Sequence, residues 1–295
     1  MPDNFAHMRN GVNAMVIAKY SPRNKEAFIL GCNGPDPLYA YQMYNPKRKL
    51  NLADLGKRMH SEKTGLFLQN LFRYAQTNAQ KDYCLGFLCH YALDCIMHPY
   101  INYITTAYSH PFNREQGHHW FESSLDSWLS EKEVESLAVN PLYYLPEMEK
   151  MYTDQIVTLM QQAIEATYTD IKLERKEYQT VLTDFKKVKN WLYSPMENKH
   201  IFAPVIEKVL RLEKGVISSR LQPCREEFSD IDVWRNNPVG FFCTETIEEL
   251  LDRADHIAAD YINTGLSYFH GITSLADLRE DIGCKNYMNG LACYL

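Results

Sequence analysis

The sequence predicts an all-α protein, and three observations carry that class. Apolar side chains recur at helical spacing over residues 156–163 and 247–261, so each segment has one apolar face. Thr246 and Glu249 form a capping box in front of the second segment, which marks the start of a helix. The 295 residues contain no run of alternating apolar and polar residues of the kind that predicts a strand.

The N-terminal part divides into helices and loops at recognisable signals. A first helix is expected over residues 4–20 and ends near the sequence SPRN. The segment 31–39, GCNGPDPLY, carries two glycines and two prolines and is expected to form a structured loop. Helical spacing of apolar residues predicts a second helix over 61–78. A third begins near Lys81 and should falter at His98, because the residue before a proline is disfavoured in a helix.

The rest of the chain is expected to be helical as well. Residues 105–117 are loop-like, and 118–130 are expected to return to a helix. We find no internal repeat and no low-complexity tract. The sequence therefore predicts a single helical domain over 1–295, with an N-terminal half of about 1–130 that holds most histidines and an outer C-terminal half of about 140–295.

Charge and cysteine content narrow the class of protein. The net charge is −6 and no long basic run is present, which disfavours a stable nucleic-acid partner. Eight cysteines are scattered without a CxxC pair, and this predicts reduced thiols instead of a disulfide framework. The first 20 residues lack a charged start followed by an apolar segment, so a cytoplasmic location is expected.

One stretch, LGFLCHYALDCIMHPYINYI at 85–104, approaches the length and apolarity of a membrane span. A span would place Asp94 and two histidines in the middle of the bilayer, at a cost of several kcal/mol. Pro99 would also interrupt it. The stretch is therefore interpreted as a buried helix, and no transmembrane segment is expected. Peripheral contact with a membrane stays open.

The polar residues of this stretch have the spacing of metal ligands. His90 and Asp94 lie four residues apart, His98 follows after four more, and His118 and Glu122 repeat the spacing. Residues four apart project from the same face of a helix, so an imidazole and a carboxylate can chelate one zinc-like ion. A single such histidine is more simply a core residue that hydrogen-bonds to Asp94 or to the backbone. The five residues together favour a metal, because a buried carboxylate needs a partner.

The ordered set of these residues resembles the zinc-dependent phospholipase C family, which is related in fold to zinc nucleases. That family has an early His, a loop Asp, a His that opens a helix, then HxxxD, a further His and HxxxE. The sequence offers a match at each step in order: His7, Asp36, His60, His90 with Asp94, His98, and His118 with Glu122. By motif the resemblance covers about residues 5–130, and residues 232–262 resemble the family's C-terminal helical part less specifically.

The resemblance implies a metal-dependent phosphodiester hydrolase. It implies an all-helical fold with two or three Zn²⁺ ions, of which two are bridged by Asp94. Asp36 would bind a metal and also orient or deprotonate the attacking water, so it is the catalytic residue. The substrate implied is a phospholipid or a related small head-group phosphodiester, and a phospholipid would yield diacylglycerol and a phosphorylated head group.

The sequence departs from the family pattern at two points. In the secreted enzymes the mature N-terminus ligates one zinc, whereas this chain begins MPDNFA with no sign of cleavage, which leaves the ion beside His7 open. His98 follows Asp94 by four residues where those enzymes have a longer gap. His98 is the expected ligand, and His110 is the alternative.

Two other functions remain as alternatives at this point. One is a zinc nuclease of the same fold, which the acidic net charge disfavours. The other is a non-catalytic helical binding protein with one structural metal, which would have a closed site of four ligands. The sequence does not indicate an oligomeric state.

Overall fold

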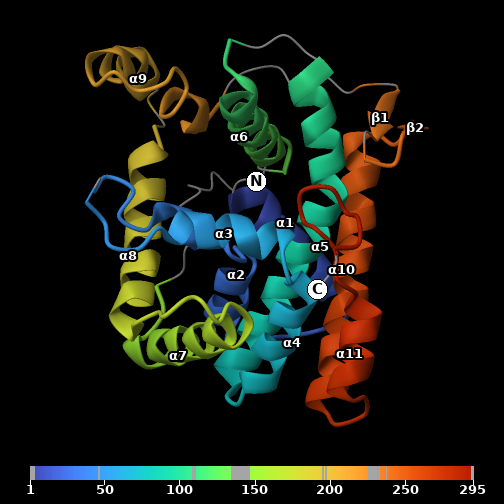
Figure 1. Ribbon diagram of the computed structural model, residues 1–295. Coiled ribbons are helices and arrows are strands. Elements are labelled where there is room, and N and C mark those ends of the chain that lie inside the picture. The colour runs from blue at the N-terminus through green and yellow to red at the C-terminus, as the bar shows by residue number, and fades with distance from the viewer. Residues whose placement is uncertain are drawn as a thin grey trace.

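A computed structural model describes residues 4–45, 47–107, 111–133, 147–194, 196, 198–224, 231, 233–236 and 238–293. Within these residues the chain folds into eleven α-helices, two short 3-10 helices and one antiparallel pair of strands (Figure 1). The predicted all-α class is confirmed. The assignment of the whole chain to one domain stays a prediction.

Helix α5, Asn78–Ala107, lies at the centre of the fold (Figure 1). Every residue from 82 to 95 is buried, which explains why this stretch is apolar on all sides. Helices α10, Ile247–Phe269, and α2, Lys25–Gly31, pack directly on it. Among the described residues we find no helix with the length and apolarity that crossing a membrane requires.

The prediction that this helix falters before Pro99 is wrong, because α5 continues through the proline to Ala107. Pro99 has no N–H to donate to the carbonyl of Cys95, one turn earlier. Gly290 packs against that carbonyl so closely that a Cβ there would lie 2.6 Å from the oxygen. Pro99 and the next two residues are themselves buried, so core packing holds the helix together across the missing hydrogen bond.

The N-terminal elements are, in order, α1, Asn4–Ile17; α2; the 3-10 helix η1, Asp36–Ala40; α3, Leu52–Ser61; and α4, Thr64–Tyr74. The helices expected over 4–20 and 61–78 are confirmed with shorter bounds. Helix α3 is not predicted by the sequence pattern. His60 lies in the last turn of α3. The family pattern implied instead that this histidine opens a helix.

Helix α6, Arg114–Glu133, contains the helix expected over 118–130. The segment expected as a loop over 105–117 is helical at both ends, because α5 reaches Ala107 and α6 begins at Arg114. His110, the alternative to His98, lies outside the described residues.

The C-terminal elements are, in order, α7, Lys150–Thr167; α8, Arg175–Leu192; α9, Asn198–Val209; the 3-10 helix η3, Ser218–Arg220; β1, Trp234–Asn236; β2, Phe241–Cys243; α10; and α11, Leu275–Ile282. The two strands correct the expectation of a chain without strands. They are three residues each and pair in antiparallel register, too short to leave an alternating pattern. The predicted capping box is confirmed: the Glu249 N–H donates to Thr246 Oγ1 at 3.2 Å, and the Thr246 N–H to Glu249 Oε2 at 2.8 Å.

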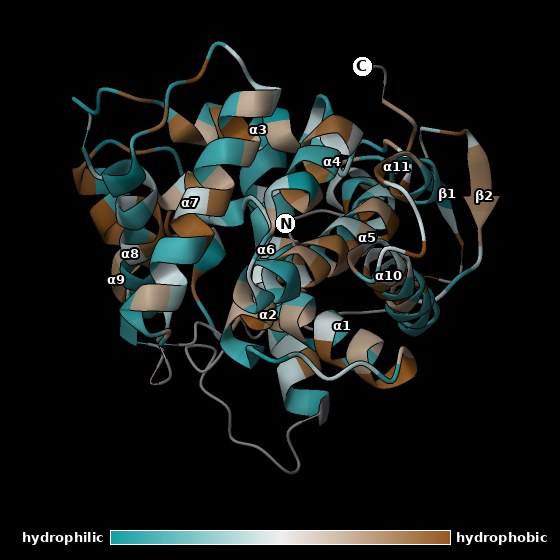
Figure 2. Ribbon diagram, turned by 90° about the horizontal axis from the view of Figure 1, so that it is seen from below, coloured by the Kyte–Doolittle hydropathy of each residue, from teal (hydrophilic) through white to brown (hydrophobic). Residues whose placement is uncertain are grey.

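The helices carry both apolar and polar residues, as the brown and teal segments of the ribbon show (Figure 2). The apolar face predicted over residues 156–163 is fully buried on α7, in the same core as apolar residues of α5 between 79 and 95. Helix α10 packs on α5 and on α1, so the C-terminal helices cover the elements that carry the histidines. The packing thus fixes α5 from several sides.

Candidate metal centre

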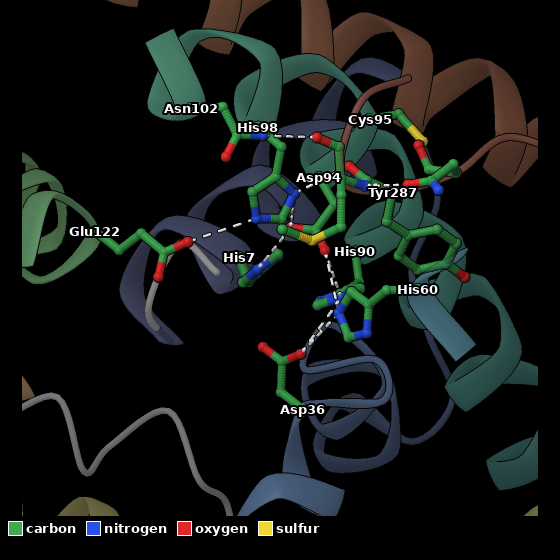
Figure 3. A network of polar contacts seen from close by, with 12 residues as sticks. His7, Asp36, His60, His90, Asp94, Cys95, His98, Asn102, Glu122 and Tyr287 are labelled. Atoms are coloured by element: carbon green, nitrogen blue, oxygen red, sulfur yellow. Dashed lines mark hydrogen bonds and ion pairs between the residues drawn. The ribbon is translucent and has the colours of Figure 1, made fainter. Parts of the chain in front are cut away.

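The structure brings all eight predicted ligand residues together from five different elements. Figure 3 labels all of them except His118. Their donor atoms form three clusters, in each of which the atoms lie within 4.8 Å of one another. The clusters are His7, Asp36 and His90; His60, His90 and Asp94; and His98, His118 and Glu122. Helix α5 contributes a residue to every cluster.

Asp94 lies between the clusters and offers its two oxygens to different histidines. Its Oδ2 lies 3.1 Å from His90 Nε2 and 3.5 Å from His60 Nε2. Its Oδ1 lies 3.5 Å from His7 Nε2 and 3.7 Å from His98 Nδ1. The carboxylate is fully buried. It therefore has the arrangement of a bridging ligand, with one oxygen directed to each side.

Asp36 completes the cluster around His60. Its Oδ1 lies 3.3 Å from His60 Nε2 and 3.7 Å from His90 Nε2. Two carboxylates thus face the same pair of imidazoles. Figure 3 shows Asp36 below these rings and Asp94 on their other side.

Helices α5 and α6 build the third cluster. Glu122 Oε1 lies 2.7 Å from His118 Nε2 and 3.5 Å from His98 Nε2. The imidazole rings of His98 and His118 are stacked with centroids 5.3 Å apart. Because α5 continues through Pro99, the proline leaves His98 directed at this cluster. His119, one residue on, places Nδ1 3.4 Å from the other oxygen of Glu122.

The donor set fits zinc. Zinc bonds of about 2.0–2.1 Å to nitrogen and oxygen place neighbouring tetrahedral ligands about 3.3 Å apart. Most donor separations around Asp94 and Asp36 are 3.1–3.7 Å. Within the part of the chain that the structure describes, several buried donor atoms make no hydrogen bond. They are both ring nitrogens of His7, Nε2 of His60, His90, His98 and His118, Oδ1 of Asp36 and both oxygens of Asp94. Buried polar atoms in this state need a partner, and a cation suits them all.

Backbone carbonyls orient three of the imidazoles. His60 Nδ1 donates to the carbonyl of Gly56 at 2.7 Å, and His90 Nδ1 donates to Cys32 at 3.3 Å. His98 Nδ1 donates to the carbonyl of Tyr287 at 3.0 Å. A carbonyl can only accept, so Nδ1 of each ring carries a proton, and in the neutral ring Nε2 offers its lone pair to a metal.

Burial keeps most of these histidines in the metal-binding form. It lowers the pKa of His98 to about 4 and holds the pKa of His7 and His118 well below the ordinary value, so all three are neutral at pH 7. Burial also acts to lower the pKa of His60, but the carboxylates of Asp36 and Asp94 outweigh it and raise that pKa to about 9. Burial opposes ionisation of Asp94, yet the nearby His90 and His98 hold its pKa well below the usual range. The carboxylates of Asp36 and Asp94 thus create a negative potential that favours a bound cation.

Solvent reaches the centre on the side of Asp36 and His118. Their side chains are 10% and 12% exposed, whereas those of His7, His60 and His90 are at most 1% exposed. The centre is therefore most accessible between η1 and the start of α6. Tyr39 is beside the centre, with its hydroxyl 3.4 Å from His60 Nδ1.

The sequence pattern does not reveal three residues that position the ligands. The Tyr287 carbonyl orients His98. The Tyr287 ring packs edge-on against the His60 ring, with centroids 5.2 Å apart. Asp126 accepts the backbone N–H groups of Phe5 and Ala6, both at 2.9 Å, and so anchors the start of α1 just before His7. Gly34 supports the ring of His90. Of these three, only Gly34 lies in a segment that the sequence marks, the predicted structured loop over 31–39.

Replacing Gly34 by alanine should displace His90. The residue has φ +50°, and a Cβ would lie 2.3 Å from Cδ2 of the imidazole. We expect a loss of stability of about 1–3 kcal/mol from backbone strain and overpacking, together with loss of bound zinc. Thermal unfolding and elemental analysis measure the two effects.

Gly271→Ala is the matched control for this substitution. Gly271 has a similar φ of +72°, but a Cβ there would meet nothing within 4 Å. This variant should carry the backbone strain alone and keep its zinc. Equal zinc content in the two variants would show that Gly34 does not position His90.

Comparison with known proteins agrees with the geometry. A family model described as zinc dependent phospholipase C matches residues 6–188, which is more than half of the chain and includes all eight residues of the centre. No curated protein and no solved structure matches the chain. The chain belongs to the zinc-dependent phospholipase C family.

Proposed function

We propose that the chain is a zinc-dependent hydrolase that cleaves phospholipids as a phospholipase C does. The observation that carries the proposal is the position of Asp94, whose two oxygens face separate groups of imidazoles. Such a bridging carboxylate would hold two ions side by side, the arrangement that two-metal phosphodiester hydrolases use. A purely structural site has four closed ligands around one ion and no need of a bridge. We propose two or three zinc ions per chain.

The residues divide the work between holding ions and handling the proton. One oxygen of Asp94 would hold an ion together with His60, His90 and Asp36, and its other oxygen would hold a second ion beside His7. His98, His118 and Glu122 would hold a third. When bound, zinc lowers the pKa of a water molecule and neutralises charge on the phosphate oxygens. Asp36 lies at the edge that solvent reaches, so its carboxylate is placed to orient the attacking water and accept its proton.

The reaction is hydrolysis at phosphorus. The water oxygen attacks the phosphorus atom in line with the glycerol oxygen, and the bond between phosphorus and that oxygen breaks. The glycerol oxygen takes up a proton and leaves as diacylglycerol, while the head group retains the phosphate. Because the ligand histidines are buried, bulk water is excluded from their side of the centre. This strengthens the electrostatic stabilisation of the charge that develops on the phosphate in the transition state.

The test combines metal content with activity. The zinc-loaded chain should contain two or three equivalents of zinc by elemental analysis and should hydrolyse a chromogenic phosphocholine ester. About one equivalent without hydrolysis would indicate a structural metal instead. If a fully loaded chain hydrolysed no member of a broad phosphodiester panel, the proposed activity would be wrong.

An exposed apolar surface favours a lipid aggregate over a soluble head-group compound. Around α9, six large apolar side chains are between 59% and 84% exposed: Met196, Ile201, Phe202, Val205, Val209 and Leu210. We call these six residues the α9 patch. Figure 1 shows α9 at the edge of the molecule, beyond the end of α8. Apolar side chains gathered in this way mark an interaction surface.

Charge favours an anionic lipid surface as the occupant of the α9 patch. Lys208, Arg211 and Lys214 are exposed beside the patch. Basic residues next to exposed apolar ones are typical of segments that lie in the interface of anionic membranes. The chain after α9 also reaches the start of α6, where Arg220 donates to Gln116 at 2.8 Å. The α9 patch is thus tied to the helix that carries His118.

The chain should bind vesicles of phosphatidylcholine with phosphatidylserine through the α9 patch. Replacing Phe202 by aspartate should weaken binding by about tenfold or more, since burying such a side chain contributes about 1.5–3 kcal/mol. Vesicle co-sedimentation in the presence of a chelator measures binding without hydrolysis.

Ile272→Asp is the matched control for the vesicle experiment. Ile272 is 74% exposed but lies after α10, away from the α9 patch, so its replacement should leave binding unchanged. Equal binding of both variants would exclude the α9 patch. A concentration-dependent dimer lost only in Phe202→Asp would assign the patch to a second copy of the chain.

A further inference from the structure

The last described residues form a small hairpin over residues 284–293, which we call the C-terminal hairpin. Lys285 and Ala292 pair as an antiparallel bridge. The N–H of Cys293 donates to the carbonyl of Cys284 at 2.9 Å. Cys284 and Cys293 are therefore directly opposite each other at the base of the hairpin.

The two thiols of this pair are in contact. Their Sγ atoms are 3.1 Å apart. Opposite residues of an antiparallel pair have Cα atoms about 4.5–5.5 Å apart, which is the separation that a disulfide spans. Thr64 Oγ1 lies 3.4 Å from Cys284 Sγ and 3.1 Å from Cys293 Sγ. The pairing therefore places the two residues at a separation that a disulfide can span.

The surroundings make the two thiols unequal. Both are part-exposed, unlike the buried Cys32, Cys84, Cys89, Cys95 and Cys224. The N–H of Gly65, in the first turn of α4, donates to Cys284 Sγ at 3.4 Å. Burial acts against the thiolate, but the contacts with Thr64 and Gly65 lower the pKa of Cys284, whereas burial raises the pKa of Cys293. The donated N–H and the lowered pKa favour Cys284 as the attacking thiol and Cys293 as the resolving one.

We propose that Cys284 and Cys293 form a redox modification site, in which oxidation by a small-molecule disulfide joins them and closes the C-terminal hairpin. The Cys284 thiolate attacks one sulfur of the oxidant and releases the first small-molecule thiolate. Cys293 then gives its proton to solvent, and its sulfur attacks Cys284 and releases the second thiolate. Two protein thiols are oxidised and one disulfide is reduced to two thiols.

The C-terminal hairpin connects this pair to the metal centre. Tyr287 lies within the hairpin, and its N–H donates to the carbonyl of His60 at 2.8 Å. The Tyr287 carbonyl accepts a hydrogen bond from His98 Nδ1. The centroid of the Tyr287 ring lies 5.2 Å from that of His60 and 5.9 Å from that of His90. A bond at the base of the hairpin holds Tyr287 against these histidines. Oxidation therefore fixes the acceptor that orients His98.

Disulfide formation is tested on the full chain with oxidised glutathione. Proteolysis without reductant and mass spectrometry should show the two cysteine peptides linked, with a loss of two hydrogens. Cys284→Ser and Cys293→Ser should each abolish the link, and Cys243→Ser, at another part-exposed free cysteine, should leave it intact. Differential alkylation of the unaltered chain gives the same reading without a substitution. Only mixed glutathione adducts, or no adduct, would overturn the site.

The connection to the metal centre has its own test, and this part rests on the proposed zinc centre. Zinc release to a chromogenic chelator should be roughly tenfold slower from the oxidised chain, at the low end of what groups behind metal-bound histidines contribute. Reduction with dithiothreitol should restore the faster rate. Equal rates would overturn the connection. A chain that binds zinc but hydrolyses nothing would refute the proposed activity alone, and a chain that binds no zinc would refute the centre and leave the disulfide site standing.

Discussion

Replacing Asp94 by asparagine should abolish hydrolysis almost completely, with a loss of about 10³-fold or more. An amide has one oxygen acceptor and no charge, so it cannot bridge two cations or balance their repulsion. Loss of metal-ion stabilisation of several kcal/mol in the transition state corresponds to such a factor, at about 1.4 kcal/mol per tenfold. Zinc content should fall by at least one equivalent. Steady-state kinetics on the chromogenic ester and elemental analysis measure both effects.

Asp82→Asn is a suitable control, because Asp82 is also a buried aspartate of α5. Its carboxylate accepts the N–H of Asn24 at 2.6 Å and the hydroxyl of Tyr20, away from the metal centre. This variant can lose stability, yet it should keep its zinc and its turnover per folded molecule. Full activity of Asp94→Asn with a normal zinc content would exclude the bridging role.

Removal of zinc should lower the melting temperature of the chain by roughly 5–10 °C for each tightly filled site. A ligand at 100 times its Kd stabilises the folded state by about 2.7 kcal/mol, and each kcal/mol shifts the melting temperature by about 2–4 °C in a chain of this size class. The physical cause is the set of buried nitrogens and oxygens that make no hydrogen bond within the described residues. Without a cation each of them costs about 1–3 kcal/mol.

Thermal unfolding with and without a chelator measures this shift, and zinc in excess of the chelator should reverse it. The Asp94→Asn variant is the internal comparison, since it has less zinc to lose and should respond less. An unchanged melting temperature after complete zinc removal would mean that the clusters do not depend on metal.

Short-range spacing made much of the centre predictable. Residues four apart share a helix face whatever the rest of the chain does, so His90 with Asp94 and His118 with Glu122 could be paired from the sequence. His7, Asp36 and His60 have no such local relation to them. They could be proposed only through the family resemblance, because the fold brings them in from separate elements.

The groups behind the ligands could not be predicted, and the reason is physical. Three acceptors are main-chain carbonyls, which every residue possesses, so Cys32, Gly56 and Tyr287 carry no sign of this role. Tyr287 is also 189 residues away from His98. The continuation of α5 through Pro99 depends likewise on a distant residue, Gly290. The rule against helix before proline is local, and tertiary packing overrides it here.

Helix α5 sets the spacing of the metal centre, since it supplies a residue to each of the three clusters. Its uninterrupted course fixes the separation between His90 and His98 at about 12 Å along the axis, from a rise of 1.5 Å per residue. The loops around the centre can gain or lose residues without changing that scale. Between residues 90 and 98 a single insertion would turn the next ligand by about 100° around the axis. Variants of this chain can therefore gain or lose residues in surface loops, while the segment from His90 to His98 must keep its length.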